Sequence, residues 1–216
     1  MCLAARLKDA TPNEVDYASK ILRKFKSHTE GLKLQNSGPT RNLKIVLCTD
    51  ASFASLANSG RQEDSLVFLL RDTGRCNLIS WNSKRIKRVA KSALAAETLA
   101  LSSGMDTSTY IASLFAELWH GNLDGAKLPI ELVVDNLSLF DALKSTKQVQ
   151  DKRLRIDVAI AKEMLSRGEV KSVRWIDTKH QLADSLTKAG ASSARLMKLL
   201  RNGNMYAADQ ETPGNL

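Results

Sequence analysis

The sequence predicts an α/β protein in which helices flank a five-stranded mixed sheet. Three strand-like apolar runs follow one another after residue 41, and two further strands then alternate with helices. Consecutive strands favour antiparallel pairing, whereas strands separated by helices favour parallel pairing, so both kinds are expected in one sheet. The chain has 216 residues, 43% of them hydrophobic, which is enough to bury one sizeable core.

The elements are predicted in a definite order. An amphipathic helix is expected over residues 12–35, with Val15, Ile21 and Phe25 on its apolar face and an end near Gly31. The segment QNSGPTRN then breaks regular structure. After it come strands at about 43–49, 65–71 and 76–81, a helix at 91–119, a strand at 130–135, a short helix, a helix at 152–167, a strand at 170–176 and a last helix at 180–188. We therefore divide the chain into an N-terminal helical segment with a linker (1–40), a main domain (41–190) and a C-terminal tail (191–216).

Composition narrows the functional classes. Thirty-two Lys and Arg against 23 Asp and Glu give a net charge of +9, which favours a polyanionic partner such as nucleic acid. Cys2, Cys48 and Cys76 show no metal-ligand spacing and indicate reduced thiols of a cytosolic or nuclear protein. The sequence contains no apolar run of membrane-spanning length, and its first residues lack a signal-peptide core, so we expect a soluble protein that is not secreted.

Two aspartates follow apolar runs. Asp50 ends IVLCTD and Asp135 ends IELVVD, so both are expected at the carboxyl ends of strands that can be parallel neighbours. Clefts of α/β sheets open at such ends. Each aspartate could instead cap a helix or belong to a turn.

Two further acids lie on predicted helices. Glu97, in SALAAETLALSS, has Leu94 and Leu101 on the same helical face, which places its carboxylate inward. Asp184, in HQLADSLTKAG, lies close to an apolar stripe. Ion pairs with Lys91 and Lys188 are the alternative for these two acids.

Four motifs in order give a resemblance to a known family. CTDAS (48–52), SLVFLL followed by LISWNSKRIKRVAKSALAAETLALS, VVDNLSLFDAL and QLADSLTKA resemble the ribonuclease H domain at the end of copia-type LTR retrotransposon polyproteins. The resemblance covers about residues 41–190, and ASKILRKFKSHTEGLKL upstream resembles the segment that joins this domain to the reverse transcriptase. The chain departs from the family at Ser52, where a second acid is common, and in RLRID (153–157), which lacks a common His.

The resemblance implies a ribonuclease H-like fold and a two-metal reaction. Two Mg²⁺ ions about 4 Å apart, for which Mn²⁺ can substitute, would activate water and neutralise charge at a phosphodiester. Asp50 would bridge both ions, Asp184 would hold the ion at the water, and Glu97 with Asp135 would hold the ion at the leaving 3′ oxygen. The expected products are a 5′-phosphate and a 3′-hydroxyl. His180, four residues before Asp184, is a candidate for proton transfer or a helix-end histidine.

Substrate contacts are predicted next to these acids. An RNA:DNA hybrid differs from duplex DNA by the 2′-hydroxyls along its minor groove. Ser52 and Asn136 are candidates for sugar or base contacts, with capping of the adjacent turn or helix as the alternative. The candidate phosphate contacts are Lys84, Arg85, Lys87, Arg88 and Lys91, with Lys152, Arg153 and Arg155 as a second set. Trp81 and Trp175 are expected in the core.

Three functions fit the sequence. The first is an endoribonuclease that hydrolyses the RNA strand of RNA:DNA hybrids during retrotransposon reverse transcription. The second is a catalytically inactive or domesticated nucleic-acid-binding domain, and the third is another nuclease of the same superfold that acts on DNA. In the first case the reverse transcriptase domain of the same polyprotein is the expected partner. The expected location is then the cytoplasm, within a virus-like particle where the element is active.

Overall fold

The computed structural model describes residues 10–27, 31–36, 42–56, 60–122, 126–146, 149–187 and 192–206. Five strands form one sheet in the order β3-β2-β1-β4-β5. The strands are β1 (Leu43–Leu56), β2 (Gly60–Arg71), β3 (Cys76–Arg85), β4 (Ile130–Val134) and β5 (Val170–Trp175). The β1–β2 and β2–β3 pairs are antiparallel, and the β1–β4 and β4–β5 pairs are parallel. The predicted mixed sheet flanked by helices is therefore confirmed.

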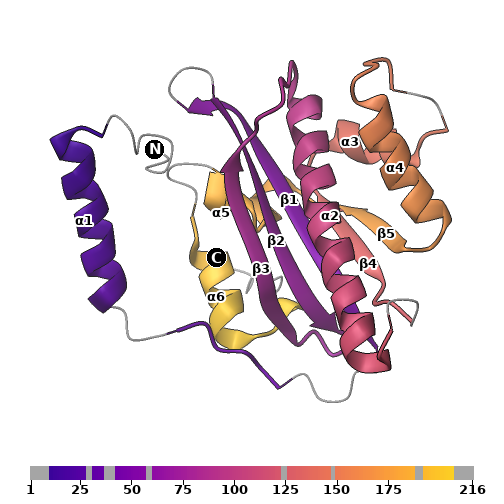
Figure 1. Ribbon diagram of the computed structural model, residues 1–216, viewed down its shortest axis with the longest axis horizontal. Helices are drawn as coiled ribbons and strands as arrows, with labels where there is room; N and C mark the ends of the chain where they lie inside the picture. Colours follow the sequence, from indigo (N-terminus) through magenta and orange to yellow (C-terminus); the bar gives the residue numbers. More distant parts are fainter. Residues whose placement is uncertain are drawn as a thin grey trace, which may run out of the picture.

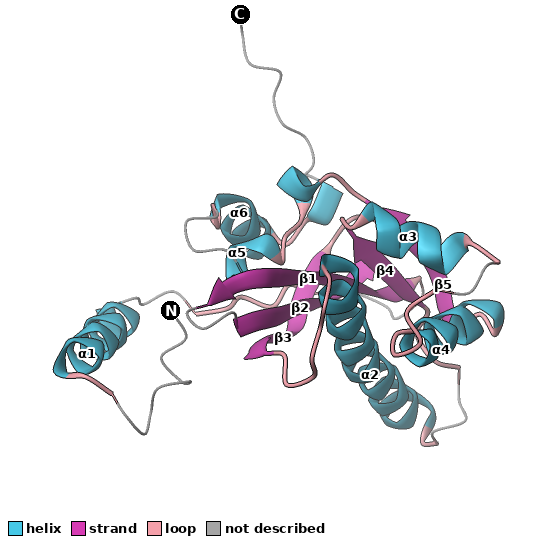
Figure 2. Ribbon diagram, turned by 90° about the horizontal axis from the view of Figure 1, so that it is seen from above, coloured by secondary structure: helices cyan, strands magenta, loops and turns pink. Residues whose placement is uncertain are grey.

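Helices cover both faces of this sheet (Figures 1 and 2). The helices are α1 (Pro12–Ser27), α2 (Ala93–His120), α3 (Leu137–Lys144), α4 (Arg155–Ser166), α5 (Asp184–Thr187) and α6 (Ala194–Asn202). One face packs against α2, α3 and α4 through Leu47, Leu132 and other buried aliphatic residues. The opposite face packs against α6, whose Leu196 and Leu199 belong to a buried cluster that includes Phe68. Within the described residues, every helix is too short or too polar to span a membrane.

Alternation along β1 assigns side chains to these two faces. Leu47 lies in the core under α2, whereas Val46 and Cys48 lie in the core on the α6 side. Because successive strand residues point to opposite faces, Thr49 belongs to the α2 side and Asp50 to the α5 and α6 side. Gly104 of α2 confirms the first assignment, since a Cβ there would come within 3.0 Å of Thr49 Cγ2.

The N-terminal helix is shorter than predicted. It ends at Ser27, and residues 31–36 are non-helical. Gln35 is held beside β3 by the Asn77 side chain, whose Oδ1 accepts from Gln35 N (2.6 Å) and whose Nδ2 donates to Gln35 O (2.9 Å). Both backbone groups of Gln35 are thus bonded to Asn77 rather than within a helix, and the helix does not continue to residue 35. The predicted apolar face, including Val15 and Phe25, is exposed on a helix that lies apart from the sheet in Figure 1.

The end of the chain also differs from the prediction. The helix expected at 180–188 is a 3₁₀ turn, Thr178–His180, followed by the short α5. Residues 194–202, expected to belong to a tail, form α6 and contribute to the core. Apolar residues of α6 are buried against a sheet face that is formed by strands distant in the sequence, so the local pattern does not indicate their burial.

Candidate metal centre

Three aspartates from three elements meet where the pairing of the central strands β1 and β4 ends. One carboxylate oxygen each of Asp50, Asp135 and Asp184 lies within 4.8 Å of the other two. Asp135 directly follows β4, and Asp184 is the first residue of α5. Asp50 lies within β1, just beyond Cys48, the last β1 residue paired with β4. The prediction that Asp50 ends its strand is therefore wrong, because β1 continues to Leu56 along its pairing with β2.

The side-chain alternation explains why these three carboxylates converge. Cys48 and Val133 pair across the parallel β1–β4 ladder, and both belong to the core on the α6 side. Asp50 and Asp135 are each two residues further along, so they point to the same face. The helix α5 packs on β1 and β2 at this face and brings Asp184 to the group.

The surroundings of Asp135 fit a cation. Its Oδ1 is buried and has no hydrogen-bond partner among the described residues. A buried carboxylate oxygen without a donor is costly, and a hard divalent cation would satisfy it together with the two other carboxylates. The carbonyl of Asp135 is held from outside by the Trp175 indole, whose Nε1 donates to Asp135 O at 2.9 Å.

Glu97 lies beside this group but outside it. It is buried (7% exposed), as predicted, on the α2 side of β1. Its Oε1 accepts a hydrogen bond from Ala51 N at 3.3 Å. Asp50 and Glu97 therefore approach the same stretch of β1 from opposite faces, and the structure brings together three of the four predicted acids.

The helix-cap alternative fails for both strand aspartates. Asn136 is the N-cap of α3, where its Oδ1 accepts from Leu139 N at 2.9 Å, whereas Asp135 precedes the cap. Asp50 lies inside a strand. The capping alternative is thus realised at Asn136, and Ser52 is buried at 4% exposure within β1.

Predictions about two kinds of side chain near the site have different outcomes. His180 ends the 3₁₀ turn, in line with the helix-end alternative, but the chain becomes extended at Gln181, so His180 and Asp184 do not share a helix as predicted. Its imidazole lines a cavity on the α6 side instead. Trp81 and Trp175 are not in the core: they are 62% and 44% exposed, since β3 and β5 are the two edge strands of the sheet.

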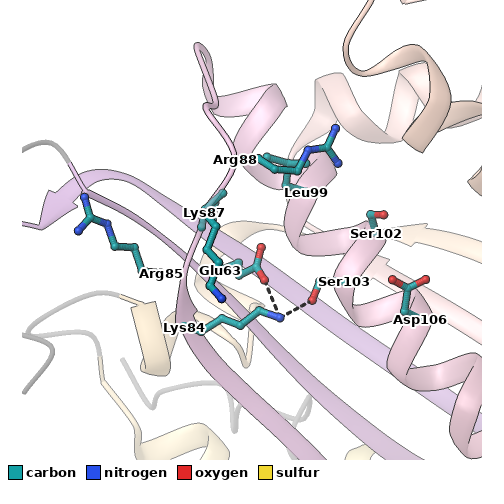
Figure 3. Close-up of a pocket in the computed structure, with 10 residues that line it drawn as sticks. Glu63, Lys84, Arg85, Lys87, Arg88, Leu99, Ser102, Ser103 and Asp106 are labelled. Carbon is teal, nitrogen blue, oxygen red and sulfur yellow. Dashed lines mark hydrogen bonds and ion pairs between the residues drawn. The ribbon is translucent and has the colours of Figure 1, made fainter. Parts of the chain in front are cut away.

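Two of the five cations in the predicted phosphate-binding run form ion pairs with acids. Figure 3 shows Lys84 between Glu63 (Nζ to Oε1, 3.0 Å) and the Ser103 hydroxyl (2.9 Å). Arg88 forms an ion pair with Asp157 at 3.0 Å. A cavity of about 310 Å³ lies beside α2 and is lined by Lys84, Arg88, Glu63 and Ser103, together with Arg85 and Lys87.

The other predicted cations are mostly exposed. Lys91, like Arg85 and Lys87, is exposed to solvent. In the second set, Lys152, Arg153 and Arg155 are all exposed, and Arg155 also donates through Nε to Val149 O at 2.9 Å.

Sequence reasoning missed a fourth acid on the α5 side. Asp64 of β2 lies opposite Asp50 in the antiparallel register and is 1% exposed. Burial raises its pKa to about 6, although hydrogen bonds from Ser83 and Gln62 oppose the shift. The Gln62 amide lies within 3.2 Å of both Asp64 carboxylate oxygens and also donates to Leu186 O of α5 at 3.0 Å.

Comparisons with known proteins find similarity only among solved structures. No family model matches the chain, and no curated protein sequence is significantly similar to it. Ribonuclease H1 from Halobacterium salinarum is 16% identical, with a TM-score of 0.46, covering 66% of this chain and 93% of its own. The N-terminal ribonuclease H domain of a Mycobacterium tuberculosis protein is 14% identical (TM-score 0.47; 78% and 97% covered). The ribonuclease H domain of prototype foamy virus is 11% identical (TM-score 0.40; 79% and 99% covered). At these identities and scores, the likeness says nothing about activity or ligands.

Proposed function

We propose that this protein is a metal-dependent endoribonuclease of the ribonuclease H type that cleaves the RNA strand of RNA:DNA hybrids. The observation that supports this most directly is that Asp50, Asp135 and Asp184 lie close together where the parallel pairing of β1 with β4 ends. Three carboxylates within 4.8 Å of one another repel unless a cation lies between them. The four sequence motifs that resemble the copia-type family place the same three acids in its catalytic set.

In this proposal the residues of the chain hold the ions and fix their ligands. Bound Mg²⁺ would supply an activated water and neutralise charge at the phosphodiester. Asp50 and Asp135 extend from adjacent strands, so their spacing depends on the β1–β4 ladder rather than on a loop. The Trp175 indole holds the carbonyl of Asp135, and the Asn136 cap holds the backbone that follows it. Glu97 approaches from the α2 side and completes the proposed set, with its Oε1 at Ala51 N.

Hybrid binding would use the exposed cations rather than the paired ones. Arg85, Lys87 and Lys91 are exposed next to the start of α2, whereas Lys84 and Arg88 would have to break an ion pair to contact phosphate. We further propose that the chain is part of a retrotransposon polyprotein and works beside its reverse transcriptase domain. Residues 1–40 would lead to that domain. The ribonuclease domain, proposed to begin at 41, would extend beyond 190 to include α6.

A catalytically inactive nucleic-acid-binding domain is the second candidate. The observation in its favour is the position of Glu97, which lies outside the group formed by the three aspartates. A site that lacks its fourth carboxylate would bind metal and hybrid but turn over slowly.

A cleavage assay separates these candidates. Labelled RNA:DNA hybrid, duplex RNA and duplex DNA are each incubated with the protein in Mg²⁺, and the products are resolved on a gel. We expect cleavage of the hybrid alone, giving 5′-phosphate ends. Asp50→Asn should lower the rate by at least about 10²-fold, because the charge that holds the metal is lost. Glu117→Gln, at an exposed position near the C-terminal end of α2, is the control and should cleave like wild type. Hybrid binding without cleavage by wild type would favour the inactive domain.

A further inference from the structure

A second cavity lies on the α6 side of the sheet, next to the aspartates. It has a volume of about 250 Å³ and is bordered by three basic side chains, Arg174, His180 and Arg195. Its floor is apolar and includes Cys48, Val133, Leu182, Ile176 and Met205. No acidic residue in the described part of the chain lines it.

The basic side chains come from three different elements. Arg174 lies on the edge strand β5, His180 ends the 3₁₀ turn, and Arg195 lies in the first turn of α6. A cation in the first turn of a helix is unfavourable, because the helix dipole is positive there. Arg174 pairs through Nε with Glu131 at 3.5 Å, but Lys44 pairs with the same carboxylate, so one acid serves two cations. An anion in the cavity would interact favourably with these basic side chains and with the N-terminal end of α6.

The cavity floor is related to the aspartate group by position in the chain. Cys48, Val133 and Leu182 each precede one of the three aspartates by two residues. Two residues of a strand span about 7 Å and return the side chain to the same face. The cavity is therefore one such step from Asp50 and Asp135, on the same side of the sheet. Successive phosphates of a nucleic-acid strand are separated by a similar distance.

We propose that this cavity binds a phosphate group, and that this is the phosphate of the RNA strand adjacent to the one held at the aspartate group. The source of the phosphate rests on the proposed function, whereas the anion site itself does not. Two guanidinium groups suit this ligand because each presents several N–H donors in a plane and stays charged. The apolar floor accommodates the sugar that joins the two phosphates.

Phosphate binding can be tested without metal or catalysis. Wild type is titrated with inorganic phosphate in chelator, and binding is followed by NMR of the protein amides and the His180 ring. We expect resonances of residues 174–182 and 195 to shift, and Arg174→Gln and Arg195→Gln each to weaken phosphate binding about tenfold or more, as expected for loss of a charge-assisted hydrogen bond. Arg167→Gln is the matched control, because Arg167 is exposed and ion-paired with Glu163 on α4. Equal phosphate affinity of wild type and Arg174→Gln would overturn the site.

The source of the phosphate is tested with a modified hybrid. One RNA phosphate next to the cleaved position is replaced by an uncharged methylphosphonate, on each side in turn. At one of the two positions, the methylphosphonate should raise the KM of wild type about tenfold, which is about the factor that the Arg174→Gln substitution gives with unmodified hybrid. The same methylphosphonate should raise the KM of Arg174→Gln little further, because the contact is already lost. If the methylphosphonate and the Arg174→Gln substitution multiply each other's effect on KM at both positions, Arg174 does not bind the adjacent RNA phosphate. If wild type cleaves no hybrid, the proposed function fails, and the titration with inorganic phosphate still decides whether the cavity is an anion site.

Discussion

Asp64 is a buried carboxylate whose ionisation opposes folding. Burial raises its pKa from 3.8 to about 6, so the folded protein holds this proton more tightly than the unfolded chain. The resulting stability is fully present below pH 3.8 and is lost as the pH rises through about 6. Two pH units correspond to at most roughly 3 kcal/mol of unfolding free energy.

We therefore expect Asp64→Asn to gain on wild type as the pH rises. In chelator, the difference in unfolding free energy between the two proteins should change by up to roughly 3 kcal/mol between about pH 4 and about pH 8, measured by urea denaturation. Ser83→Ala removes a hydrogen bond that lowers the Asp64 pKa, so in that variant the loss should extend to higher pH. A pH-independent difference between Asp64→Asn and wild type would contradict the assignment.

The acids of the site differ in how far the sequence could predict them. Asp50 and Asp135 each follow an apolar run directly, and the change from apolar residues to an acid indicates a carboxylate near the end of a buried strand segment. Asp64 lies in RQEDS, a polar stretch typical of a turn, and no sequence pattern marks it as buried. Its burial arises because β2 begins at Gly60, earlier than predicted, and α5 packs over its first half. That contact joins residues more than 100 positions apart, so local pattern does not contain it.

At the level of elements, α5 depends on contacts made by other segments. A helix of four residues is far below the length that is stable alone. Gln62 of β2 donates to Leu186 O at one end of α5, and Gln181, just before the helix, donates to Thr49 O at 2.9 Å. These two amides fix the position of Asp184 over β1.

Removing the Gln62 amide should therefore weaken metal binding. Gln62→Leu keeps the approximate volume but loses the hydrogen bond to α5, which is worth about 1 kcal/mol, or roughly fivefold in Mn²⁺ affinity. Isothermal titration calorimetry with Mn²⁺ measures this change. Gln150→Leu, at an exposed loop position, is the control and should bind like wild type. If both variants bind Mn²⁺ equally well, Gln62 does not position Asp184.

Element type was predictable from sequence to a greater extent than element ends. Periodicity identified all five strands and the long helix α2, because each contributes buried apolar residues to the core. The end of β1 was missed because this part of the strand is held by pairing of Asp50, Ala51, Ser52 and Leu56 with β2, which the hydrophobic pattern does not show. The helix α6 was missed because its apolar stripe is short, and the sheet face that covers it is formed by distant strands.

For the whole molecule, the fold brings several negative charges together at one place, although the chain has a net charge of +9. Parallel pairing of β1 with β4 brings Asp50 next to Asp135, and packing of α5 on β1 and β2 adds Asp184. None of these acids is near another in sequence, so their repulsion exists only in the folded protein. The metal-free fold is thus less stable than its core alone would make it.

Relieving this repulsion should stabilise the whole protein when metal is absent. In chelator, we expect Asp135→Asn to melt several degrees above wild type, since two unit charges within 4.8 Å of each other repel by roughly 3 kcal/mol at an effective dielectric constant of about 20. In millimolar Mg²⁺ wild type should gain more than the variant, because binding to the native state adds RT ln(1 + [L]/Kd) and the variant has lost a ligand. Thermal melts of both proteins in both buffers measure the effect, with Asp106→Asn as the control whose shift should be the same in each. If the melting-temperature difference between Asp135→Asn and wild type is the same with and without Mg²⁺, the three aspartates do not form a metal site. The effect of this substitution depends on Mg²⁺ only if Asp135 is a ligand of the ion.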